Sequence, residues 1–253
     1  GYTFTMPGES VTIKAVYQNR FYDLTVDGKT ESREYGSLVN VTAPEKEGYT
    51  FAGWTVKGAQ VDNPYNQTLL FRMPAGDVTL TPNYTANKYS LTVDDTMEFK
   101  DYGEPVTVTA AEKEGYTFTD WAVDGVTVAD KTSKTLAFTM PAGDVTLTAN
   151  YAINHYTLTV NGKAEQKEYG ERVYTYAEDR TGWIFTGWEA TGLELTAEEK
   201  ADRGIGFYMP AHDVTLTAQY EAEKYTLSVT NGTPENTTAV AGTEVTLTAN
   251  APA

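Results

Sequence analysis

The sequence predicts an all-β chain in which a small module of about 67 residues repeats in tandem. A fourteen-residue segment begins at Phe4, Phe71, Phe138 and Phe207, at offsets of 67, 67 and 69 residues. Apolar and polar residues alternate within it, as in DVTLTANY from Asp144, and a period of two marks a half-buried strand. The 18 tyrosines and the abundant threonines also favour strands.

Three further segments recur in the same order and with nearly the same spacing. Four segments in one fixed order, repeated three times, mark a tandem array. The three segments are YDLTVDG at Tyr22 with counterparts at Tyr89, Tyr156 and Tyr225, the Tyr-Gly pairs at Tyr35, Tyr102 and Tyr169, and GYTFAGW at Gly48 with counterparts at Gly115 and Gly182. We therefore expect complete modules at 22–88, 89–155 and 156–224, the end of a preceding copy at 1–21 and the start of a following copy at 225–253.

The joints between modules are short, as in Tyr84-Thr-Ala-Asn-Lys-Tyr89, and lack the Gly/Ser composition of a flexible linker. A module of this size buries only about 60% of its unfolded surface and is marginally stable alone. We therefore expect each module to gain stability from contacts with the neighbouring repeats of the same chain.

Residues that favour tight turns lie between the alternating runs. Asp27-Gly28 and Asn161-Gly162 predict two-residue hairpins of type I′, and Asp94-Asp95 gives a weaker signal at the same place in the second copy.

The segment Met-Pro-Ala-Gly-Asp predicts a turn before the last strand of each module. Pro74 fixes φ, Gly76 suits a positive φ, and Asp77 can accept backbone N–H bonds. His212 replaces the glycine in the third copy, and a positive φ is less favourable there.

Two local irregularities are expected inside the modules. Phe51 and Trp54 differ in parity, so a regular strand would face them oppositely, and a bulge would place both in the core. In the third copy, Thr196-Ala-Glu-Glu199 has the pattern of a capping box and predicts one short helical turn.

The recurring tryptophans Trp54, Trp121 and Trp188 have two interpretations. Each follows an alternating aromatic segment, which favours packing in the core beside residues such as Phe118. An exposed tryptophan would instead offer an apolar face on which a sugar ring stacks.

Composition excludes several classes of function. A formal net charge of -16 argues against nucleic acid and anionic membranes as partners. The absence of cysteine excludes disulfides, thiolate metal sites and cysteine nucleophiles. No apolar run reaches the roughly 18 residues that predict a membrane-spanning helix, so we expect no membrane insertion.

The ionisable residues form no pattern of a catalytic or metal site, so we expect no catalytic residue, cofactor or metal. Two carboxylates that flank a sugar could hydrolyse a glycoside, but the acidic residues recur in each copy rather than marking one site. Asp94-Asp95 remains open as a weak calcium ligand. The remaining alternatives are glycosylation at Asn-x-Thr triplets and a Lys–Asn cross-link. The residues concerned are His155 and His212; Asp77, Asp144 and Asp213; Glu45, Glu47, Glu112 and Glu114; Asn40, Asn66 and Asn236; and Lys88 and Lys224, whose place is taken by Arg20 and His155 in other copies.

The chain resembles the B-repeat family of internalin-type surface proteins, in its divergent form. The resemblance rests on Tyr22 to Val26, the Tyr35-Gly36 pair, Glu47 to Trp54 and Gly76 to Leu80, and it extends over nearly the whole chain. Copy two departs at Asp120, where a glycine precedes the tryptophan in copy one, and copy three departs at Trp183-Ile184.

The resemblance implies small β-grasp-like modules in an extracellular, cell-surface or wall-attached protein of a bacterium. We expect the array to form an elongated rod and to act as a non-catalytic stalk. Two alternatives stay open: adhesive modules that bind host glycan or protein, and accessory repeats of a larger secreted hydrolase. The partial copies at 1–21 and 225–253 would expose unpaired strand edges, which predicts fraying or end-to-end self-association.

Overall fold

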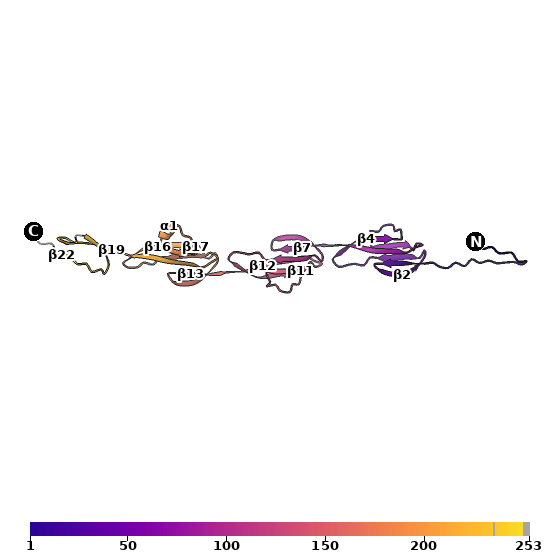
Figure 1. Ribbon diagram of the computed structural model, residues 1–253, viewed down its shortest axis with the longest axis horizontal. Coiled ribbons are helices and arrows are strands. Elements are labelled where there is room, and N and C mark those ends of the chain that lie inside the picture. The colour runs from indigo at the N-terminus through magenta and orange to yellow at the C-terminus, as the bar shows by residue number, and fades with distance from the viewer. Residues whose placement is uncertain (235, 250–253) are drawn as a thin grey trace. The chain divides into compact units, whose positions relative to one another are not determined.

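The computed structural model describes residues 1–234 and 236–249 (Figure 1). Six strands recur in the same order in three successive repeats, and almost no helix interrupts them. The strands of the first repeat are β1 (Phe21–Val26), β2 (Lys29–Glu34), β3 (Leu38–Thr42), β4 (Tyr49–Lys57), β5 (Thr68–Arg72) and β6 (Val78–Ala86). The predictions of an all-β chain and of a tandem array are confirmed.

The second and third repeats contain counterparts of these six strands. Those of the second repeat are β7 (Lys88–Val93), β8 (Thr96–Asp101), β9 (Pro105–Thr109), β10 (Tyr116–Asp124), β11 (Thr135–Thr139) and β12 (Val145–Ile153). Those of the third repeat are β13 (His155–Val160), β14 (Lys163–Glu168), β15 (Arg172–Tyr176), β16 (Trp183–Thr191), β17 (Gly204–Tyr208) and β18 (Val214–Ala222).

Each repeat consists of a four-stranded mixed sheet and a separate two-stranded antiparallel sheet. In the first repeat the larger sheet has the order β2-β1-β6-β4, and β3 pairs with β5. The two central strands, β1 and β6, run parallel with Leu24 opposite Val78, whereas β2 and β4 pair antiparallel at the edges. The second and third repeats have the same strand order.

The core of each repeat lies between its two sheets. In the first repeat the buried residues come from the central parallel strands, from the two-stranded sheet and from the turn before β6. The fully buried residues include Leu24, Val39, Met73, Val78 and Leu80. Since alternate residues of a strand face opposite ways, the alternating segments seen in the sequence supply one apolar face to this core.

The expected hairpins and bulge are present. Asp27, Asp94 and Asn161 all have a positive φ in the two-residue turns that join the first two strands of each repeat. The pairing of β4 with β6 shifts register after Phe51, and both Phe51 and Trp54 belong to the core.

The glycine of the Met-Pro turn corrects one expectation. Gly76 and Gly143 lie outside the positive-φ range, so the turn requires no left-handed residue there. This explains why His212 can occupy the same place in the third repeat.

A short helix, α1 (Ala197–Ala201), lies beside β16 and β17 in the third repeat (Figure 1). Thr196 is its N-cap: the Thr196 side chain accepts a hydrogen bond from Glu199 N at 3.1 Å, and Glu199 Oε2 accepts one from Thr196 N at 2.8 Å. The capping-box prediction is therefore confirmed.

The two ends differ from the complete repeats. Residues 1–20 contain no strand, and all of them are exposed. After β18 the chain forms two antiparallel pairs, β19 with β21 and β20 with β22. These strands are β19 (Lys224–Ser228), β20 (Gly232–Thr233), β21 (Asn236–Val240) and β22 (Thr248–Ala249).

Candidate functional site at the repeat joints

A single residue separates the last strand of the first repeat from the first strand of the second. This residue, Asn87, lies between β6 and β7. Its N–H donates to Gly48 O at 2.9 Å, and its own carbonyl accepts a hydrogen bond from Tyr102 N at 2.8 Å. The joint is therefore bonded to the loop before β4 on one side and to the end of the next hairpin on the other.

The side chain of Asn87 adds a third bond. Thr50 Oγ1 donates to Asn87 Oδ1 at 2.5 Å, so the joint is also tied to the edge strand β4. Asn154 makes the equivalent bonds at the second joint: its N–H to Gly115 O at 2.9 Å, its carbonyl to Tyr169 N at 2.9 Å, and its side chain to Thr117 Oγ1 at 2.6 Å.

The ring of Tyr102 lies directly against Gly48. A Cβ atom at Gly48 would come within 2.2 Å of Tyr102 Cγ, and Gly48 has a φ of +73°. The same ring contacts Tyr49 edge to face, with the centroids 5.4 Å apart. Two reasons require glycine at this position. Its backbone conformation favours glycine, and the ring of the following repeat occupies the space that a side chain would fill.

The second joint repeats this packing. A Cβ atom at Gly115 would lie 2.1 Å from the ring of Tyr169, and Tyr169 contacts Tyr116 with the centroids 6.0 Å apart. In the sequence the Tyr-Gly pairs and the Gly-Tyr segments are separate recurrences. No local pattern in the sequence indicates that the tyrosine of one repeat covers the glycine of the repeat before it.

The third joint lacks most of these contacts. Glu223 stands where the first two joints have asparagine, and Ile184 stands where they have threonine. Glu223 N still donates to Gly182 O at 2.9 Å. Ala241 occupies the position that is equivalent to Tyr102. This equivalence rests on Gly242, which has a positive φ like the glycine that follows the tyrosine in the other repeats.

Because Ala241 has no ring, the backbone of Gly182 is left uncovered. A Cβ atom at Gly182 would meet nothing within 4 Å, and Trp183, the counterpart of Tyr49, is 52% exposed. Among the residues that the structure describes, this joint keeps one of the three hydrogen bonds of the other joints, and Ala241 cannot make the ring contact.

The recurring aspartates have a structural role at the start of the parallel pair. The Oδ1 atoms of Asp77, Asp144 and Asp213 accept backbone N–H bonds from the first strands of their repeats at 2.9, 2.7 and 2.7 Å. The bond from Ser90 N holds the pKa of Asp144 below its ordinary value. These bonds join the Met-Pro turn to a strand that is 54 or 56 residues away.

The three recurring tryptophans are buried, which decides between their two interpretations. Trp54 Nε1 donates to Gln67 O at 3.3 Å, and Trp188 Nε1 donates to Asp202 O at 3.1 Å. Trp121 Nε1 is buried and has no hydrogen-bond partner among the described residues. A buried tryptophan cannot serve as a sugar platform, so these positions belong to the core.

The histidines stay apart from each other and from any cluster of ligands. His155 Nε2 lies 3.6 Å from Glu168 Oε1, and His212 Nδ1 lies 3.3 Å from Asp213 O. Within residues 1–234 and 236–249, no three His, Asp or Glu residues form a group that could hold a metal ion. Asp94, the alternative calcium ligand, occupies the hairpin turn between β7 and β8.

The other candidate residues are not brought together. Glu45, Glu47, Glu112 and Glu114 are exposed, and Glu112 forms an ion pair with Lys134. Lys88 Nζ contacts Asp101 Oδ1 at 2.8 Å rather than an asparagine. Arg20 O accepts the backbone bond from Tyr35, Lys224 begins β19, Asn40 and Asn66 are exposed, and Asn236 begins β21 with a side chain outside the description.

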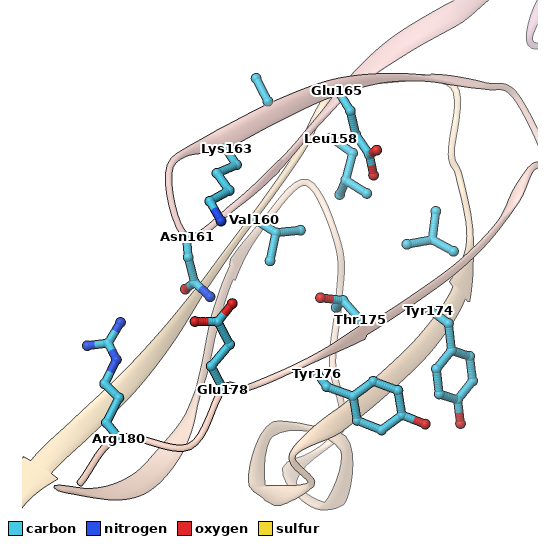
Figure 2. Close-up of a pocket in the computed structure, with 12 residues that line it drawn as sticks. Leu158, Val160, Asn161, Lys163, Glu165, Tyr174, Thr175, Tyr176, Glu178 and Arg180 are labelled. Carbon is cyan, nitrogen blue, oxygen red and sulfur yellow. The ribbon is translucent and has the colours of Figure 1, made fainter. Parts of the chain in front are cut away.

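The third repeat contains a hollow of about 540 Å³ beside strand β15 (Figure 2). Leu158 and Val160 line it from β13, and Thr175 lines it from β15. Figure 2 shows the rings of Tyr174 and Tyr176 on the opposite side of β15 from Leu158 and Val160. The hollow has a charged rim that includes Lys163, Glu165, Glu178 and Arg180.

No helix within the described ranges is long and apolar enough to cross a membrane.

Comparisons with known proteins place the repeats in a family. The model of the divergent InlB B-repeat domain matches residues 24–88, 90–155 and 156–224. Internalin H of Listeria monocytogenes is 39% identical over 142 residues, which cover 51% of this chain and 24% of the relative. A protein of Evansella cellulosilytica described as a Gly-rich membrane protein is 28% identical over 256 residues, covering 89% of this chain and 28% of the relative.

The chain therefore spans only about a quarter of the length of these relatives. The family match covers most of the chain and falls on the three repeats whose strands, cores and joints were described above. The chain belongs to the divergent InlB B-repeat family.

Proposed function

We propose that these repeats are non-catalytic spacer modules of a bacterial cell-surface or secreted protein. The observation that supports this most is the joint at Asn87. A single connecting residue with backbone bonds to both repeats, together with a ring packed on a glycine, restricts how one repeat can turn against the next. A spacer needs such restriction, because freely swinging modules would not hold a distal domain away from a surface.

The size of the joint contacts supports restriction rather than free rotation. A hydrogen bond contributes about 0.5–1.5 kcal/mol net, and an aromatic pair about 0.5–1.5 kcal/mol beyond its burial. Two hydrogen bonds hold Asn87 to the first repeat, and one hydrogen bond and one ring pair from Tyr102 hold the second repeat to it, so the contacts of Tyr102 favour the docked state by about 1–3 kcal/mol. That is enough to keep the joint docked for most of the time.

The relatives support a place at the cell surface. The family is that of a repeat domain of internalins, and one relative is described as a membrane protein. Extracellular exposure and attachment to the cell wall follow as parts of the same proposal, with the elongated rod and the module boundaries at 22–88, 89–155 and 156–224.

Small-angle X-ray scattering of the chain tests the spacer. The wild-type protein should fit a narrower distribution of maximum dimensions than the variant that carries Tyr102→Ala with Tyr169→Ala. Tyr35→Ala is the matched control, because Tyr35 holds the same place in the first repeat but is exposed. Equally broad distributions for the wild type and the double variant would refute a role for the joints in spacing.

A second candidate function is adhesion to a glycan. It gains support from three exposed tyrosines on the outer face of the two-stranded sheet of the third repeat, at positions where the other two complete repeats have no tyrosine.

A further inference from the structure

The outer face of the two-stranded sheet in the third repeat carries three exposed tyrosines. Val173 and Ile205 face the core from β15 and β17, so the residues that alternate with them face outward. Tyr174, Tyr176 and Tyr208 are 59%, 64% and 67% exposed.

Two glycines on β17 make room for the rings. Tyr174 pairs with Gly206, and Tyr176 pairs with Gly204. A Cβ atom at Gly206 would lie 2.7 Å from Tyr174 Cε2, and one at Gly204 would lie 2.6 Å from Tyr176 Cε1. Neither glycine has a φ in the left-handed range. The backbone does not require glycine here, whereas the flat placement of the two rings across the neighbouring strand does.

The other complete repeats build the same sheet without these residues. In the first repeat the corresponding pairs are Asn40 with Leu70 and Thr42 with Thr68, and the two threonine hydroxyls are 2.9 Å apart. The second repeat has Thr107 and Thr109 on one strand and Ala137 and Thr135 on the other.

The third repeat thus departs at four positions together. Glycine inside a strand weakens it, while covering tyrosines recover part of that loss. Since the other repeats form the same sheet with asparagine, leucine, threonine and alanine at these positions, the fold alone does not explain the four changes. A flat aromatic surface is what the changes create.

The rings form a continuous surface with polar edges. The centroids of Tyr174 and Tyr176 are 5.3 Å apart and their planes are inclined by 47°. The neighbouring Tyr174 side chain, followed by partial desolvation, raises the pKa of Tyr176. A phenol hydroxyl can both donate and accept a hydrogen bond. A pyranose ring has the matching chemistry: apolar C–H groups on its face and hydroxyls around its rim.

Size and charge distinguish among possible ligands. Five residues on each of two strands give a platform of roughly 17 by 10 Å, far below the ~800 Å² that each partner of a stable protein complex buries. Nucleic-acid bases also stack on tyrosine, but the net charge of -16 opposes a polyanion. A neutral oligosaccharide fits both limits.

We propose that Tyr174, Tyr176 and Tyr208 form a carbohydrate-binding platform, on which pyranose rings of a neutral glycan stack. This site can be tested separately from the spacer function, because its tyrosines are not among the residues that form the joint contacts of Asn154 and Tyr169.

The test is a titration of the whole ¹⁵N-labelled chain with chitotetraose and with cellotetraose, followed by ¹H–¹⁵N correlation spectra. The amides of Gly204 and Gly206 lie beneath the rings and should shift saturably with at least one sugar. Tyr174→Thr with Tyr176→Thr, which installs the residues of Thr107 and Thr109, should weaken binding at least about tenfold. Tyr35→Thr, an exposed tyrosine of the first repeat, should bind as the wild type does.

A second variant keeps both tyrosines. Gly206→Ala should push the Tyr174 ring off the sheet and weaken binding, and it serves as the test if the double variant does not fold. The proposal is overturned by any of three results: no shift with either sugar, unchanged binding in the folded variants, or shifts with oligothymidylate in place of the sugars.

Discussion

Replacing Trp121 by alanine should unfold the second repeat while its neighbours remain folded. Trp121 is 1% exposed and packs against Phe118, with the ring centroids 5.7 Å apart. Emptying a buried tryptophan site costs about 3–5 kcal/mol. A repeat of this length has a total stability of about 3–10 kcal/mol at 0.05–0.15 kcal/mol per residue. The substitution therefore removes a large share, and in the lower half of that range most or all, of the stability of the repeat.

Hydrogen exchange measured by mass spectrometry on the whole chain separates the repeats. Peptides from β7 to β12 should lose protection in Trp121→Ala, and peptides from β1 to β5 should keep theirs. Trp183→Ala is the matched control, because it removes a tryptophan that is half-exposed. It should change the free energy of opening measured by hydrogen exchange by less than about 1 kcal/mol. Unchanged protection in the second repeat of Trp121→Ala would refute the core assignment.

Four further predictions follow from individual contacts. The backbone bond from Ser90 lowers the pKa of Asp144. The stability that this carboxylate contributes is therefore present above the unfolded pKa and is lost as pH falls through the folded pKa. Melting temperatures measured between pH 5 and pH 3 should fall more steeply in the wild type than in Asp144→Asn, around the ordinary range near pH 4. Thr196→Ala removes the N-cap of α1 and should reduce amide protection there by about 1 kcal/mol, without altering exchange in β13. Gly115→Ala places a Cβ within the ring of Tyr169 and should broaden the scattering distribution, whereas Gly170→Ala, beside open space, should broaden it less. Calorimetry with Zn²⁺ should give no stoichiometric micromolar binding, because His155 and His212 occupy unrelated positions of their repeats; such binding would contradict this expectation.

The features predicted from sequence are those decided within a few residues. The turns at Asp27 and Asn161 need residues that tolerate positive φ, and the capping box of Thr196 needs a partner three residues away. The bulge near Trp54 was found because the alternation itself changes parity there. In each case the physical cause lies inside the segment whose pattern was examined.

The features that sequence reasoning missed join distant segments. The ring of Tyr102 and the backbone of Gly48 belong to different repeats, so no local pattern links them. Gly76 was expected to have a positive φ, but its φ lies outside that range and a Cβ there would meet nothing within 4 Å, so neither its backbone conformation nor its surroundings require glycine. One signal was present: where the tyrosine becomes Ala241, the segment it would cover becomes Trp183-Ile184.

The third repeat differs from its neighbours in ways that share a physical logic. Its core residues Leu158, Val214 and Leu216 are as buried as their counterparts in the other repeats, so its fold is held by the same contacts. Its departures are the inserted helix, the tyrosines over glycines and the uncovered joint after Gly182, all of them at the surface. Surface substitutions away from caps and turns change stability little, so such positions are free to differ between repeats. A function specific to one repeat should therefore be sought where its surface departs while its core does not, and in this chain both the candidate binding platform and the loosened joint belong to that repeat.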